Sequence, residues 1–183
     1  MEAYVYLRVQ PGKVSSVLTQ LAASSGLRRA VAVVGGWDIL IQVEGNDMEQ
    51  IATVILSQIH GIDGVNRTMT APVVPPDRVG IAGWGTSKTP SLVAGACYVH
   101  MKTEAGAAAG LVERISDLPD VAGVAVLGGE YDVLACIAQP WEVASGVVLE
   151  QIHSLPGVQS TSTLVSLLYE EPEEDRDQFS AWS

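Results

Sequence analysis

One short phrase occurs twice in the sequence and constrains the fold more than any other feature. Residues 33–40 read VVGGWDIL, and residues 127–134 read LGGEYDVL. In each phrase an apolar run stops at glycine, passes an aromatic residue and an aspartate, and then resumes. Glycine tolerates positive φ and aspartate tolerates turns, so the pattern predicts a β-hairpin. We therefore expect two copies of one structural unit.

The first copy alternates between strand and helix patterns in the order βαββαβ. Strands are indicated by apolar residues at every second position, and helices by apolar residues three or four positions apart. Asn46, with Glu49 three residues later, is expected to cap the second helix. The expected strands are 4–9, 30–34, 37–43 and 68–74, and the expected helices carry apolar stripes at 14–21 and 48–59.

The second copy repeats this order at a nearly constant shift in numbering. Asp38 corresponds to Asp132 at a shift of 94 residues, and Met48 corresponds to Trp141 at a shift of 93. The stretch between the copies is rich in Gly, Ser, Thr and Pro, which is typical of a linker. We predict domains at 1–75 and 96–169, a linker at 76–95 pinned by Trp84, and an acidic tail at 170–183.

Each βαββαβ unit is expected to form an antiparallel sheet with helices on one face only. Tyr4 and Tyr6 in the first copy, and Tyr98 and His100 in the second, lie on the other face, which needs cover. The predicted fold class is therefore α+β, with two ferredoxin-like units of the dimeric α+β barrel type. The units pack sheet to sheet as a pseudo-dimer within one chain. The residues expected under the helices are Val5, Leu7, Val99 and Met101.

The two cysteines are expected on opposite faces of the second sheet. Cys97 falls in phase with Val99, whereas Cys136 falls in phase with Leu134. Side chains alternate along a strand, so on neighbouring strands the two thiols face opposite sides and cannot form a disulfide.

Composition excludes several classes of protein. The formal net charge is −11, which argues against nucleic acid because DNA-binding proteins neutralise phosphates with clustered Lys and Arg. No apolar run approaches the ~20 residues of a membrane-spanning helix, and the N-terminus lacks the pattern of a signal peptide. We therefore expect a cytoplasmic protein that binds no nucleic acid directly and does not enter a membrane.

The ordered motifs resemble the effector-binding domain of the Lrp/AsnC (feast/famine) regulators, also called the RAM domain, which is ACT-like. GGWDIL and GGEYDVL at the hairpins, and GVNRTMT and GVQSTST before the last strands, carry the resemblance. It implies binding of amino acids or similar small molecules, and assembly into oligomers. The chain shows two tandem copies without the family's helix-turn-helix, so we expect any effect on transcription to be indirect.

The resemblance places the effector site at the hairpin turn and on the last strand. An α-amino acid needs a carboxylate for its ammonium and N–H or O–H donors for its carboxylate, which these residue types supply. The alternative is that Asp38 and Asp132 only cap the turn. The predicted ligand-binding residues are Gly36, Trp37, Asp38, Thr68 and Thr70 in the first copy, and Glu130, Tyr131, Asp132, Thr161 and Thr163 in the second.

Two classes of function remain. The first is a non-catalytic sensor of a small molecule, without cofactor or metal, which forms a homo-oligomer and acts with a relative that carries a helix-turn-helix. The second is an enzyme of the dimeric α+β barrel kind, such as a small monooxygenase or a haem-binding protein. His60, His100 and His153 keep this alternative open. We favour the sensor and predict no enzyme activity, because no catalytic motif is present and a helix-end histidine suits the helix dipole.

Overall fold

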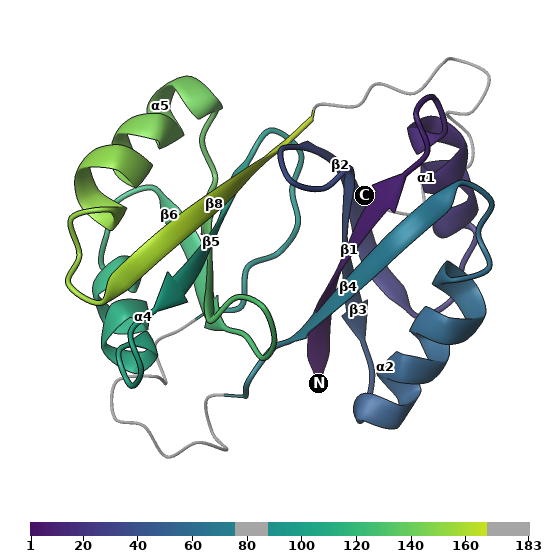
Figure 1. Cartoon of the computed structure of the whole chain (residues 1–183), viewed down its shortest axis with the longest axis horizontal. Helices are drawn as coiled ribbons and strands as arrows, with labels where there is room; N and C mark the ends of the chain where they lie inside the picture. Colours follow the sequence, from purple (N-terminus) through teal and green to yellow (C-terminus); the bar gives the residue numbers. More distant parts are fainter. Residues whose placement is uncertain (76–87, 168–183) are drawn as a thin grey trace.

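The computed structural model describes residues 1–75 and 88–167, and each unit has the order βαββαβ (Figure 1). The expected contact of Trp84 and the acidic tail at 170–183 lie outside these residues. The first unit contains β1 (Glu2–Val9), α1 (Val14–Ala22), β2 (Leu27–Val34), β3 (Ile39–Glu44), α2 (Met48–Val54), η1 (Ile55–Ile59) and β4 (Val65–Pro72). The second contains β5 (Cys97–Thr103), α4 (Ala108–Ser116), β6 (Val121–Val126), β7 (Val133–Ile137), α5 (Trp141–Gly146), η3 (Val147–Ile152) and β8 (Val158–Ser166).

The strands of both units join into one antiparallel sheet of eight strands, in the order β4-β1-β3-β2-β8-β5-β7-β6. At the junction β2 pairs with β8, with Val33 opposite Ser166. A bridge between Val73 and Leu127 also joins the segment after β4 to the end of β6. The sheet therefore curves around a shared interior, as strands do in a barrel.

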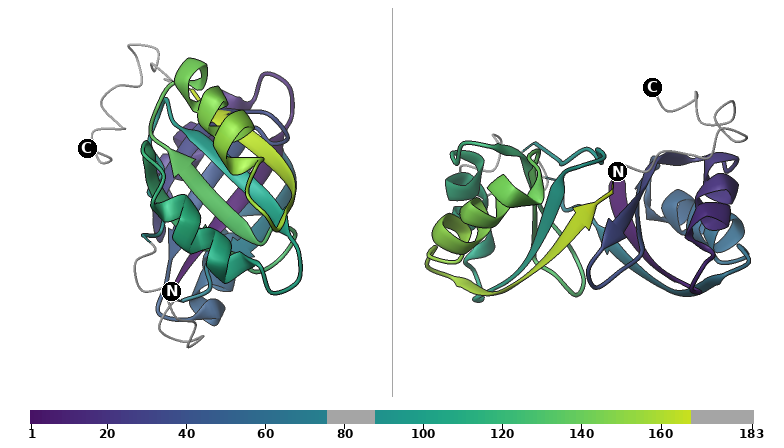
Figure 2. Two further views of the ribbon diagram at one scale, coloured as in Figure 1. Left: turned by 90° about the vertical axis from the view of Figure 1, so that its left-hand side faces the viewer. Right: turned by 90° about the horizontal axis from the view of Figure 1, so that it is seen from above.

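Alternation along the strands produces three hydrophobic cores, as the sequence predicted. Tyr4, Tyr6 and Tyr98 lie in an inner core between the two half-sheets. Helices cover the outer faces of both half-sheets (Figure 2). The predicted α+β fold with two units packed sheet to sheet is confirmed. The residues expected under helices lie in the two outer cores: Val5 and Leu7 in one, Val99 and Met101 in the other.

The cysteines follow the same alternation. Cys97 belongs to the outer core of the second unit and Cys136 to the inner core. Both are free and buried, so the prediction that they face opposite sides of the sheet is confirmed.

The cap of the second helix lies one residue later than we predicted. Asp47 is the N-cap, and its Oδ1 accepts a hydrogen bond of 2.8 Å from the N–H of Gln50. Gln50 in turn accepts a hydrogen bond of 2.7 Å from the N–H of Asn46 through Oε1. The prediction for Asn46 is wrong, because Asp47 has the extended backbone and the free carboxylate that a cap requires.

The segment that leads into the second unit closes one end of the interior. Leu92 is completely buried in the inner core. The Tyr4 hydroxyl donates to the carbonyl of Pro90, and the Tyr98 hydroxyl accepts from the N–H of Val93 at 2.5 Å. None of the helices within the described ranges is long and apolar enough to cross a membrane.

Candidate functional site

Four rings form a continuous row across the interior. Trp37 and Tyr6 have ring centroids 5.8 Å apart, Tyr6 and His100 have centroids 5.1 Å apart, and His100 and Tyr131 have centroids 4.9 Å apart. We call these four residues the aromatic row. The internal repeat relates Trp37 to Tyr131 and Tyr6 to His100, so the row crosses from one unit to the other at equivalent positions.

His100 is held in one orientation by two hydrogen bonds. Its Nδ1 lies 3.2 Å from the carbonyl oxygen of Ser162, and its Nε2 lies 2.7 Å from the Tyr6 hydroxyl. A carbonyl only accepts, so Nδ1 donates to Ser162 and Nε2 accepts from Tyr6. Burial lowers the pKa of His100 to about 4 and raises the pKa of Tyr6 well above its ordinary value. Both groups are therefore neutral near pH 7.

Two exposed cations lie beside the Trp37 end of the row: Arg8 on β1 and Arg67 on β4, which we call the basic mouth. Arg8 and Arg67 are direct neighbours in the β1–β4 register. The guanidinium carbon of Arg67 lies 5.4 Å from the centre of the Trp37 ring, and Lys102 corresponds to Arg8 in the repeat. Like charges directly opposite on neighbouring strands destabilise a sheet, and the long, partly exposed contact between Arg8 and Asp38 offsets this repulsion only in part.

Both predicted aspartates tie a hairpin turn to the neighbouring strand. Asp38 Oδ2 accepts from the N–H of Val9 at 2.8 Å, and Asp132 Oδ2 accepts from the N–H of Thr103 at 2.7 Å. The two carboxylates thus accept hydrogen bonds from the ends of β1 and β5 rather than from N–H groups of their own turns. The second oxygen of Asp38 remains directed to the basic mouth, since Oδ1 lies 3.7 Å from Nη1 of Arg8.

Each hairpin turn lies against the last strand of the other unit. A Cβ atom at Gly35 would lie 2.8 Å from the carbonyl oxygen of Thr163, and one at Gly129 would lie 3.6 Å from that of Thr70. Gly128 donates its N–H to the carbonyl of Pro72 at 2.8 Å. The structure thus brings the predicted residues Thr70 and Thr163 to the turn of the opposite copy.

The other predicted threonines bind histidines at the ends of the second helices. Thr68 Oγ1 lies 2.9 Å from Nε2 of His60, and Thr161 Oγ1 lies 2.6 Å from Nε2 of His153. A pocket of about 240 Å³ borders His60, Thr68 and Arg67. The predicted Gly36 and Glu130 are exposed on their turns.

The sequence interpretation did not identify the basic mouth as a site. Arg8 alternates with Tyr6 and so falls on the same face of β1, but its neighbour Arg67 lies far away in the sequence. In the stretch NRTMT, Arg67 alternates with Met69, so the two side chains lie on the same face of the strand. Met69 is paired with Tyr6, so this is the inner face, and the alternation could have identified Arg67 as a candidate.

Comparison with known proteins links the first unit to a family of ligand-binding domains. Residues 2–75 match the Lrp/AsnC ligand binding domain. A similar protein is an uncharacterised HTH-type transcriptional regulator of Pyrococcus furiosus, which is 30% identical over 71 residues. That match covers 37% of this chain and 47% of the relative, so the chain spans about half of the relative's length.

The whole chain is similar in fold to a solved enzyme. The siroheme decarboxylase NirDL, in a complex with an iron-uroporphyrin III analogue, matches 100% of this chain and 80% of its own with a TM-score of 0.61 and 11% identity. A second structure of the same enzyme matches 99% of this chain and 79% of its own, with a TM-score of 0.61 and 12% identity. At this identity the likeness shows the shared fold.

This likeness corrects one prediction. We predicted that the chain is not an enzyme because it carries no catalytic motif, and that prediction is wrong, since the fold that matches along the complete chain is that of an enzyme. The physical reason is that a site between two sheets takes single residues from separate strands, so no contiguous motif marks it.

Proposed function

We propose that the protein binds a small carboxylate-bearing molecule at the basic mouth, with the flat part of the molecule against the aromatic row. The supporting observation is the position of Arg8 directly opposite Arg67 beside Trp37. The two cations repel each other in the free protein, and a bound carboxylate removes the repulsion while accepting charge-assisted hydrogen bonds. The ring of Trp37, which lies beneath Arg67, then supplies an apolar surface for the rest of the ligand.

The match of the first unit to the Lrp/AsnC ligand binding domain supports a regulatory role for this binding. In this role the ligand is an amino acid, whose carboxylate binds Arg67 and whose ammonium binds Oδ1 of Asp38. Residues 1–75 and 96–169 act as two tandem domains of this kind. Whole chains form homo-oligomers in the cytoplasm and act with a relative that carries the DNA-binding helices.

The full-length likeness to siroheme decarboxylase favours a second candidate, an enzyme that acts on a carboxylated tetrapyrrole. The two cations of the basic mouth suit a ligand with more than one carboxylate. The hydrogen bond between Tyr6 and His100 provides a neutral pair that can hold a proton next to such a ligand. In both candidates the ligand carries a carboxylate and occupies the same end of the interior.

A thermal-shift screen of amino acids and carboxylated porphyrins separates these candidates. A ligand at 100 times its Kd adds about 2.7 kcal/mol to the free energy of unfolding, which is a readily measured rise in Tm. Stabilisation by an amino acid supports the regulatory candidate, and stabilisation by a porphyrin with loss of a carboxyl group supports the enzyme. The variant Arg8→Ala/Arg67→Ala should abolish the response to an aromatic amino acid or to a porphyrin, and Arg114→Ala, on the outer helix α4, is the charge control. Binding that is equal in all variants would contradict the proposal.

A further inference from the structure

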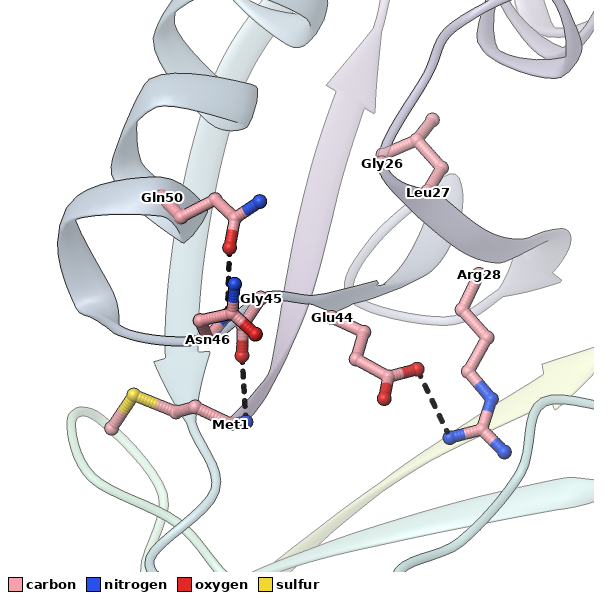
Figure 3. Close-up of a pocket in the computed structure, with 8 residues that line it drawn as sticks. All are labelled: Met1, Gly26, Leu27, Arg28, Glu44, Gly45, Asn46 and Gln50. Carbon is pink, nitrogen blue, oxygen red and sulfur yellow. Dashed lines mark hydrogen bonds and ion pairs between the residues drawn. The ribbon is translucent and has the colours of Figure 1, made fainter.

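A polar pocket of about 530 Å³ lies at the other end of the first unit (Figure 3). Arg28 near the start of β2 and Glu44 at the end of β3 form one wall, and Asn46 and Gln50 at the start of α2 form the opposite wall. The pocket is remote from the basic mouth along β1, because Glu2 at the start of that strand neighbours this pocket and Arg8 at its end belongs to the mouth.

The side chain of Arg28 is directed to the pocket by an irregularity in the sheet. The register between β2 and β3 shifts between Leu27 and Arg29, so Arg28 is the extra residue of a β-bulge. Bulges redirect side chains and often occur beside functional sites. Arg28 Nη1 lies 2.6 Å from Glu2 Oε1 and 3.7 Å from Glu44 Oε2.

The two contacts of Arg28 differ in strength. The side chain of Glu2 is 21% exposed, and its second oxygen also lies 3.3 Å from Nε2 of Gln42. The side chain of Glu44 is 61% exposed and its contact with Arg28 is long, so this half of the cluster contributes little stability. Glu2 therefore fixes the guanidinium in place, whereas Glu44 is free to separate from it.

The second unit shows that the fold does not require these charges. Its β6–β7 pairing has the same register shift, between Val121 and Gly123. Alanine stands at all three equivalent positions: Ala96 for Glu2, Ala122 for Arg28 and Ala138 for Glu44. The same strands and the same bulge form around three alanines, so these elements do not need the charged cluster in order to form. Glu2 and Glu44 are moreover direct neighbours in the β1–β3 register, which is unfavourable for two carboxylates.

We infer that this pocket is a second binding site, for a small zwitterion such as an amino acid without a ring. The ligand carboxylate binds Arg28, which Glu2 holds in position, and the ligand ammonium binds Glu44. The amide groups of Asn46 and Gln50 on the opposite wall bind the polar part of its side chain. Separation of Arg28 from Glu44 replaces one weak ion pair by two charge-assisted contacts to the ligand. This site is independent of the ligand proposed at the basic mouth.

Titration calorimetry with the non-aromatic amino acids as probes tests this inference on the full chain. At least one of them should bind the wild type, and Arg28→Ala should weaken its binding by about tenfold or more, the loss expected for a charged hydrogen bond. The variant Glu2→Ala/Arg28→Ala/Glu44→Ala copies the second unit, so it should fold and should not bind. Arg8→Ala/Arg67→Ala should bind as the wild type does.

Three outcomes would overturn the inference. The first is that no non-aromatic amino acid binds the wild type. The second is that binding survives in the triple alanine variant with an unchanged circular dichroism spectrum. The third is that binding is lost in Arg8→Ala/Arg67→Ala and kept in the triple variant, which would assign the amino acid to the basic mouth and support the function proposed there.

Discussion

Tyr6 and His100 occupy equivalent positions of the internal repeat and are hydrogen-bonded to each other, with 2.7 Å between Oη and Nε2. Equivalent residues of a two-fold arrangement touch each other only at its axis, so this pair marks the pseudo-two-fold axis of the chain. A homodimer would have the same residue at both positions. This chain instead places a tyrosine opposite a histidine, so a hydrogen bond between Tyr6 and His100 takes the place of the Tyr–Tyr or His–His contact that two identical subunits would have.

Replacement of Tyr6 by Phe should destabilise the protein. The change removes the hydroxyl that donates to Nε2 and leaves this buried acceptor without its partner, at a cost of about 1–3 kcal/mol. Urea unfolding of the wild type and the variant measures the difference. A free energy of unfolding within error of the wild type would show that the hydrogen bond contributes nothing to stability.

His100 should make the stability of the protein depend on pH. Burial lowers its pKa from 6.5 to about 4 in the folded chain. Between these values the unfolded chain binds a proton that the folded chain does not, so the free energy of unfolding decreases as pH falls. The decrease from His100 begins below about pH 7 and reaches about 3 kcal/mol near pH 4.

The variant His100→Gln removes this contribution because glutamine does not titrate. Denaturant unfolding at several pH values between neutral and acidic should show a steeper loss for the wild type than for the variant. Parallel pH profiles for the two proteins would contradict the assignment of this dependence to His100.

Gly123 should be sensitive to the addition of one methyl group. A Cβ atom there would lie 2.6 Å from the carbonyl oxygen of Lys88 and 3.0 Å from Cα of Pro90, both in the backbone of the segment that closes the interior. Gly123→Ala should therefore cost about 1–3 kcal/mol through overpacking. Gly110→Ala, in α4 with no atom within 4 Å, is the control and should be neutral or stabilising. Equal stability of the two variants by denaturant unfolding would refute this account of the segment.

The two glycines of the first hairpin turn should respond differently to alanine. Gly35 has a φ of +140° and no room for a Cβ atom, because that atom would lie 2.8 Å from the carbonyl oxygen of Thr163. Gly36 has no atom within 4 Å of its Cβ position. Gly35→Ala should lower Tm by disturbing the contact between the units, and Gly36→Ala should leave Tm nearly unchanged. A larger effect at Gly36 than at Gly35 would contradict this assignment.

Local patterns were sufficient to predict the faces of each strand and the cores. The alternation of Tyr4 and Tyr6 with Val5 placed each residue in the correct core, because each half-sheet is covered by helices on one face and by its partner on the other. The pairing of β2 with β8 and the bridge between Val73 and Leu127 join the two copies over long sequence distances. Such pairings have no local signal.

The candidate site was harder to predict for the same reason. Thr68 was expected at the effector site with Trp37, but Thr68 bonds to His60 whereas Trp37 lies in the inner core. The motif combines residues of a turn with residues of a distant strand. Its sequence does not show which face of the sheet each of these residues occupies. The pairing of Arg8 with Arg67 required the register of β1 and β4, which only the structure supplies.

Fluorescence of Trp37 provides the most direct measurement of ligand binding at the basic mouth. Titration with the ligand found in the screen should change tryptophan emission in the wild type and not in Trp37→Phe, because this ring lies beneath Arg67 at the mouth. Calorimetry should show that Trp37→Phe still binds, and that Arg8→Ala/Arg67→Ala weakens the affinity about a hundredfold, as the loss of two charged hydrogen bonds implies. Unchanged affinity in the double arginine variant, or an emission change that persists in Trp37→Phe, would contradict binding at this site.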